Sequence, residues 1–330
     1  GLHLCDAANR SALELALHNN HLETLQVLLE QPNVDINGIT LRGSSLLHEA
    51  AESGDEHKVN FLLSHGAHVD VLNPNAETPL HWACSLGHVN VVRCLTQHGA
   101  DALLHERVQG FTPIHAACGP RGQPAVIALL IQRCELMRWN GLPAGCNVLD
   151  FARNTPLHTC VRQSPHAAKG IPLLLEHGAD PAARNLDGQT VLHLLAERAV
   201  RTQQERAGIG ESTERPIGAI EAGGGVEDVA PRAPPELPID RLLPMLSDLP
   251  LALDAQETET GNTALHIAAF GGSIEIATFL VGLGASVALP NKDGFTPLDS
   301  MQPSGIDGKS IAEVLLSRID RPPSWVPDRL

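Results

Sequence analysis

One short phrase recurs along the sequence, and it limits the possible folds more than any other feature. The phrase is a Ser or Thr, two small or apolar residues and, in most copies, a His. Its copies start at Ser11, Ser45, Thr78, Thr112, Thr155, Thr190, Thr263 and Thr296. Consecutive starts are 34, 33, 34, 43, 35, 73 and 33 residues apart. This period predicts a stack of similar supersecondary units, because one such unit cannot bury its own apolar face.

Each copy of the phrase has the features of a helix start. The Ser or Thr fits an N-cap, whose hydroxyl accepts an orphan backbone N–H, and a Pro such as Pro79 fits the first helical position. Ala residues that follow allow a neighbouring unit to approach closely. Left-handed helix ends are expected at Asn20, Gly54, Gly87 and Gly272. A second segment with apolar residues at helical spacing follows and ends at His-Gly-Ala, as at 98–100.

The pattern resembles the ankyrin repeat. The matching residues are the Thr-Pro-Leu-His phrases at Thr78 and Thr155, the Gly between the two helices, and the Gly-Ala-Asp endings at 99–101 and 178–180. The resemblance implies an all-α ankyrin-repeat solenoid of about eight helix–turn–helix repeats with β-hairpin-like fingers, covering nearly all of residues 1–320. No polar cap repeat precedes the first one, so we expect a piece of a longer array.

The sequence divides into four parts. Residues 1–201 hold repeats one to five and the first part of repeat six. Residues 202–238 are an acidic, Gly- and Pro-rich insertion that we expect to be disordered. Residues 239–320 complete repeat six and add repeats seven and eight, and 321–330 form a linker. The long break is either an insertion looped out of repeat six or a domain boundary. A shorter insertion is expected at about 138–148.

The last ten residues carry a second resemblance. Trp325 and Asp328 form a Trp-x-x-Asp phrase that is similar to the entrance of a FYVE zinc finger, where these two residues help to bind phosphatidylinositol 3-phosphate. The zinc-binding cysteines of that finger are absent from the chain. Combined with the ankyrin-like array, the phrase resembles the rabankyrin-type ankyrin/FYVE proteins, which are endosomal effectors of a Rab GTPase. Alternatively, Trp325 packs over the final repeat.

Charge and composition exclude several classes of partner. The formal net charge is −15, which disfavours nucleic acid and anionic membranes, because binding to phosphates relies on Lys and Arg. The seven Cys include no Cys-x-x-Cys pair, which fits free, mostly buried thiols in a reducing compartment. We see no signal peptide and no apolar run long enough to span a bilayer. A cytoplasmic protein is expected, and the rabankyrin-type resemblance implies association with endosomes for the full-length protein.

The 17 His do not indicate an enzyme. Six of them occupy the fourth position of the phrase, so we expect one His per layer, tying turns to helices by hydrogen bonds. Metal ligation is the alternative. We expect no catalytic residue, no metal site and no cofactor in this chain, with zinc only if a FYVE finger follows outside it. An enzymatic or ligand-binding module in the insertion remains an alternative.

The ankyrin resemblance implies protein partners, held on the concave face by the turn tips and the exposed side of the first helices. A Rab GTPase is the partner that the rabankyrin-type resemblance implies, and the alternative is a regulator or inhibitor in cytoplasmic or nuclear signalling. Phe111 and Phe295 stand where the pattern has a polar residue, so each is either a binding hot spot or a ring packed on the adjacent finger. The candidate residues are Leu41, Arg42, Ser44, Glu52, Ser53, Pro74, Asn75, Glu77, Ser85, Leu86, Val108, Gln109, Phe111, Leu186, Asp187, Gln189, Glu259, Asn262, Lys292 and Phe295.

Overall fold

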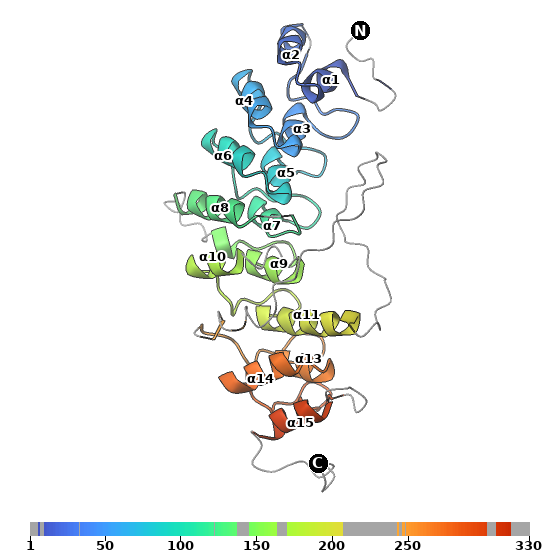
Figure 1. The fold of residues 1–330 in the computed structure, drawn as a ribbon, viewed down its shortest axis with the longest axis vertical. Coiled ribbons are helices and arrows are strands. Elements are labelled where there is room, and N and C mark those ends of the chain that lie inside the picture. Colours follow the sequence, from blue (N-terminus) through green and yellow to red (C-terminus); the bar gives the residue numbers. More distant parts are fainter. Residues whose placement is uncertain are drawn as a thin grey trace. The chain divides into compact units, whose positions relative to one another are not determined.

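A computed structural model places most of the repeats. It describes residues 6, 10–32, 34–121, 123–136, 145–163, 170–206, 243, 246–247, 249–301 and 308–317. The chain divides into two compact units, residues 1–180 and 181–330. The regular elements in the described part of both units are helices (Figure 1).

The first unit holds five pairs of antiparallel helices, one pair for each of repeats one to five (Figure 1). The first helices of successive pairs pack on one another in one row, and the second helices form a row beside it. A short 3-10 turn, η2, precedes the fifth pair. The elements are α1 (Ala12–His18), α2 (Leu22–Leu29), α3 (Leu46–Ser53), α4 (Glu56–Ser64), α5 (Pro79–Leu86), α6 (Val89–Gln97), α7 (Pro113–Ala117), α8 (Pro124–Leu136), η2 (Gly145–Asn147), α9 (Pro156–Gln163) and α10 (Gly170–Glu176).

The second unit repeats the same plan. Its elements are α11 (Val191–Arg206), α13 (Ala264–Phe270), α14 (Ile274–Leu283) and α15 (Gly308–Leu316). α11 packs directly on α13 although the long insertion separates them in sequence. Leu243 and Leu246, which resume the helical spacing after that insertion, are helical and buried. The packing of α11 on α13 is that of the first helices of two neighbouring repeats.

The predicted helix boundaries are confirmed by their caps. Ser45, Thr78 and Thr263 have extended backbones, and the side-chain oxygen of each accepts a hydrogen bond from the backbone N–H three residues later. Pro79 and Pro113 occupy the first helical turn. The residues expected to end first helices have positive φ, namely Asn20, Gly54, Gly87 and Gly272. Each such N-cap stabilises a helix of this length by about 1 kcal/mol.

The core is a continuous apolar seam inside each unit. It includes the aliphatic residues at the third position of the phrase, and burying each one contributes roughly 2 kcal/mol. These residues are Leu47, Leu80, Ile114, Leu157, Leu192 and Leu265, all at most 2% exposed. Cys84, Cys94, Cys118, Cys134, Cys146 and Cys160 are also buried and form no disulfide, as expected.

The structure differs from the sequence-based expectations at three places. α11 continues to Arg206, five residues into the segment 202–238 that we expected to be disordered. The first helix expected in repeat eight is only a turn at 297–300. The fingers between repeats are turns, with no strand assigned among the described residues. The rest of the long insertion and residues 318–330, including Trp325 and Asp328, lie outside the described residues. None of the described helices is long and apolar enough to cross a membrane.

Candidate functional site

Histidines of the phrase join neighbouring repeats within each unit. The backbone N–H of the cap residue donates to the His Nδ1, at 3.1 Å in the case of Thr78 and His81. The Nε2–H of the same ring donates to the carbonyl oxygen of the residue just before the next cap, at 3.1 Å for His81 and Phe111. The same outgoing bond is made by His48 to Glu77, His115 to Asn154, His193 to Asn262 and His266 to Phe295, at 2.9–3.2 Å. We call these five residues the histidine ladder.

Both nitrogens of each ladder ring are used, which fixes the neutral Nε2–H tautomer. Burial lowers the pKa of His48, His81, His193 and His266, and it lowers the pKa of His115 to about 4 despite the opposing bond to Asn154. A ring that is buried, neutral and bonded at both nitrogens ties the layers together. In the described part of the chain, no three His, Cys, Asp or Glu side chains are grouped so that they could hold a metal ion.

Acidic residues replace His at the two ends of the series. In repeat one, Glu14 accepts the backbone N–H of Ser11 at 2.6 Å. In repeat eight, Asp299 accepts the backbone N–H and the hydroxyl of Thr296, at 3.0 and 2.6 Å. A carboxylate completes the cap as His does, but it has no proton to donate onward.

A second set of links between repeats was missed in the sequence. An Asn or Asp side chain in the turn after the second helix accepts the backbone N–H at the matching position of the next repeat. The pairs are Asn37 with His68, Asp70 with Asp101, Asn147 with Asp180 and Asp254 with Ser286, at 2.7–3.1 Å. An Asn or Asp recurring 31–33 residues before each of these positions is the signal that could have revealed this Asx row.

Backbone bonds also join neighbouring fingers. Arg107 N–H donates to the carbonyl of Asn75 at 2.7 Å, and Phe151 N–H donates to that of Gln109 at 2.9 Å. Thr258 with Asp187 and Lys292 with Thr260 repeat the link in the second unit. Pro74 stands at the donor position in repeat three and has no N–H, so it cannot make this bond. The finger tips are therefore held in a regular row within each unit, with one link fewer at Pro74.

Most of the predicted partner-binding residues are accessible. Leu41 is 76% exposed, Val108 70%, Leu186 58% and Phe295 52%. The other exposed residues are Arg42, Glu52, Ser53, Pro74, Asn75, Ser85, Asp187, Glu259 and Lys292, and the half-buried ones are Glu77, Leu86, Gln109, Phe111, Gln189 and Asn262. Ser44 was predicted wrongly, because it is 3% exposed and its hydroxyl donates to Glu49 at 3.0 Å. It lies beneath the finger, so it supports Glu49 and cannot meet a partner.

The two singled-out aromatics differ in their surroundings. The ring of Phe111 is half-buried and stacks on the buried His115, with ring centres 5.6 Å apart. The ring of Phe295 lines an open groove of about 360 Å³ together with Ile267, Phe270 and Asp299. Phe111 thus resembles a packed ring, and Phe295 an exposed one. Phe270, at the end of α13 and 56% exposed, was missed because it looks like an ordinary helix residue in the sequence.

Other exposed apolar side chains on the fingers were also missed. Phe151 is 58% exposed at the tip of the finger of repeat five, parallel to the ring of His105 with centres 6.3 Å apart. Leu72 and Ile39 are exposed at the edges of their fingers. They do follow the repeat: Ile39 and Leu72 each stand six residues before a cap, and Phe151 stands four residues before one, as Leu41 and Val108 do. This spacing is the signal that could have revealed them.

Family comparisons agree with this architecture. Residues 47–140 match a family model described as "Ankyrin repeats (3 copies)", and residues 260–292 match one described as "Ankyrin repeat". Among solved structures, the ankyrin repeat domain of human ASB11 aligns with 85% of this chain and all of that domain, at a TM-score of 0.57 and 23% identity. The ankyrin repeat domain of Bcl-3 aligns with 83% of this chain and 99% of that chain, at a TM-score of 0.58 and 24% identity. These likenesses show the fold.

Sequence relatives are similar over part of their length. Human SMC5-SMC6 complex localization factor protein 1 is 35% identical over 129 residues, which are 38% of this chain and 12% of that protein. Ankyrin repeat and SOCS box protein 11 of Danio rerio is 33% identical over 131 residues, or 40% of each protein. Human Rabankyrin-5 is 30% identical over 193 residues, or 48% of this chain and 15% of that protein. The chain therefore spans less than half the length of these relatives.

Proposed function

Since this chain is an ankyrin-repeat protein and thus a protein–protein interaction module, we propose that its finger tips and the exposed side of its first helices hold the partner. The fold is that of a non-enzymatic scaffold, and we propose that it works without a cofactor. The histidine ladder and the Asx row support this role by fixing the spacing of the layers. A partner then meets a preformed surface, which lowers the entropic cost of binding.

The observation that carries the proposal is the exposure of large aliphatic side chains at finger tips. Leu41, Val108 and Leu186 are the most exposed aliphatic residues on the fingers. Single exposed apolar residues are ordinary on a protein surface. These recur on the same structural element of repeats two, four and six, next to the backbone bonds that hold the fingers in register. Burying each of these side chains against a partner would contribute roughly 2 kcal/mol to the free energy of binding.

Paired substitutions test this proposal with a matched control. Val108→Ser changes a finger tip, and Val27→Ser makes the same change on α2, where Val27 is 57% exposed. Affinity capture from cell extract, read by mass spectrometry, should lose the same proteins with Leu41→Ser and with Val108→Ser, and retain them with Val27→Ser. Equal capture by all three variants, at equal thermal stability, would overturn the proposed surface.

We propose more specifically that the partner is a Rab GTPase and that the full-length protein works on endosomes. The support is the similarity to Rabankyrin-5 over 48% of this chain, together with the Trp325 and Asp328 phrase noted in the sequence. Binding to a panel of purified Rab GTPases is expected for the GTP-bound form and not for the GDP-bound form. Binding to none of them would reject the Rab partner and leave the interaction surface standing.

A regulator of cytoplasmic or nuclear signalling is the second candidate. Its support is the similarity to relatives other than Rabankyrin-5, including SMC5-SMC6 complex localization factor protein 1. Localisation of a fluorescent fusion separates the two candidates. Endosomal puncta formed by a fusion of the full-length protein support the first candidate, and a diffuse or nuclear signal supports the second.

A further inference from the structure

The first layer of the stack lacks the histidine link. Glu14 stands at the ladder position of α1 and is 1% exposed. Its Oε2 accepts the N–H of Ser11 at 2.6 Å, and its Oε1 is buried without a hydrogen-bond partner. A buried carboxylate oxygen with no donor destabilises the fold, more strongly when the group is charged. The site therefore needs a proton donor that reaches Glu14 Oε1.

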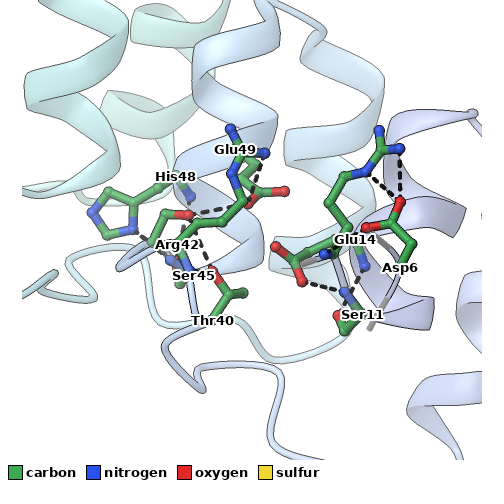
Figure 2. A network of polar contacts seen from close by, with 10 residues as sticks. Asp6, Ser11, Glu14, Thr40, Arg42, Ser45, His48 and Glu49 are labelled. Carbon is green, nitrogen blue, oxygen red and sulfur yellow. Dashed lines mark hydrogen bonds and ion pairs between the residues drawn. The ribbon is translucent and has the colours of Figure 1, made fainter. Parts of the chain in front are cut away.

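Glu49 on α3 lies beside Glu14 (Figure 2), near enough for the Glu14 carboxylate to act on the pKa of Glu49. Its side chain is 14% exposed, its Oε1 accepts the hydroxyl of Ser44 at 3.0 Å, and the guanidinium of Arg42 is 4.0 Å away. Burial and then the charge of Glu14 raise the pKa of Glu49 to about 7, against the lowering effect of Ser44 and Arg42. Two carboxyl groups from neighbouring repeats thus meet in a site that is largely closed to water.

We propose that the Glu49 carboxyl group, in its protonated form, donates a hydrogen bond to the unpartnered Oε1 of Glu14. The resulting carboxylic acid–carboxylate hydrogen bond joins α3 to α1 where the other layers have a histidine link. When Glu49 loses this proton to solvent, two buried negative charges face each other and the first repeat loosens from the second. The first layer is then a proton-dependent end of the interaction surface.

The surrounding charged groups leave the pair with little compensation. Asp6 and Arg10 form an ion pair with each other at 2.8 Å. Arg42 is half-exposed, so solvent screens its charge. The other titratable groups on the elements that pack against the pair are Lys58, whose Nζ donates to the carbonyl of His18 at 3.3 Å, the buried His48 and His81, the half-buried Glu77, and the exposed His18, His21, Glu23, Glu52, Glu56 and His57. Apart from Arg42, whose guanidinium lies 4.0 Å from Glu49 Oε1, none of these described groups is a cation paired with either carboxylate.

The direction of the pH effect follows from the two states of Glu49. Unfolded, the group titrates near 4.5, and folded it titrates at about 7. Its contribution to the docking of repeat one is therefore complete below pH 4.5, declines as the pH rises, and is lost above pH 7. The equilibrium constant for docking repeat one on repeat two should therefore fall roughly tenfold between pH 6 and pH 8. This factor follows from the folded and unfolded pKa values of Glu49.

Carbon-13 NMR of the whole chain, with the glutamate carboxyl carbons labelled, tests the proton directly. One carboxyl carbon should titrate near pH 7, and its signal should vanish in Glu49→Gln. In Glu14→Gln the new amide can donate a hydrogen bond to Glu49. The midpoint of the Glu49 titration should therefore move down by more than one pH unit. The control Glu52→Gln, at the exposed position three residues further along α3, should leave it unchanged. A protein in which every glutamate titrates below pH 6 would overturn the proposal.

Hydrogen exchange tests the loosening. After correction for intrinsic rates, the amides of α1 in the wild-type chain should exchange roughly tenfold faster at pH 8 than at pH 6, relative to the amides of α5. In Glu14→Gln this ratio should be close to one, because the amide supplies the missing donor at both pH values. Equal corrected protection of α1 at both pH values in the wild-type chain would refute the link between proton and docking.

Discussion

Lowering the pH from 7.5 to 5.0 is expected to weaken the repeat stack at the histidine ladder, and His115 sets the magnitude. Burial lowers the pKa of this ring to about 4, whereas the unfolded ring titrates near 6.5. A depressed histidine pKa means that the unfolded state binds protons first, so stability is complete above pH 6.5 and is lost as the pH falls toward 4. At pH 5 the loss from His115 alone amounts to about 2 kcal/mol.

Two neighbouring effects shape how this loss is measured. The pKa values of His48, His81, His193 and His266 are lowered by burial too, so they add losses of the same sign. Glu49 acts in the opposite sense, because its raised pKa makes the first layer more stable in acid. Total stability against pH therefore mixes the two signs, and a single variant is needed to isolate one ring.

His115→Gln provides that variant. A glutamine amide can accept from the Thr112 N–H and donate to the Asn154 carbonyl, as the ring does, but it does not titrate. Urea unfolding followed by circular dichroism should give a larger free energy of unfolding for the wild type than for His115→Gln at pH 7.5. The difference between the two free energies should be about 2 kcal/mol smaller at pH 5. A gap that stays the same at both pH values would refute the assignment of a buried, neutral His115.

Three further predictions concern backbone geometry, the Asx row and the thiols. Gly87→Ala should lower the free energy of unfolding by more than Gly66→Ala, because both have positive φ but only the Cβ at 87 would meet backbone within 3 Å; equal thermal shifts would contradict this. Asp70→Ala should cost about 1 kcal/mol in urea unfolding, and Asp70→Asn, which keeps an acceptor, much less. Burial raises the pKa of Cys84 and Cys118, so mass spectrometry after iodoacetamide should find both unmodified in the folded chain and modified in urea.

Much of the fold could be predicted from the sequence because its determinants are local. The Ser or Thr cap and the Pro after it act within one helical turn, and a Gly at positive φ acts at a single residue. The period of the phrase then set the number of layers, and the predicted ends at Gly54 and Gly87 have the left-handed backbone. The histidine row was predicted as a tie between turns and helices, and the ring bonds of His81 show both halves of that tie.

Contacts between layers were beyond sequence reasoning, because they depend on which residues of two repeats face each other. Ser44 looked like an accessible finger residue, yet packing of the finger over α3 buries it against Glu49. Phe111 and Phe295 both stand just before the cap that starts the phrase, but one ring stacks on His115 and the other lines a groove. In the sequence, Glu14 shows only that the copy of the phrase at Ser11 lacks the His. Only the folded structure shows that Glu14 Oε1 is buried without a donor and that α3 brings a second carboxyl group beside it. The energy of a charge depends on what surrounds it in space.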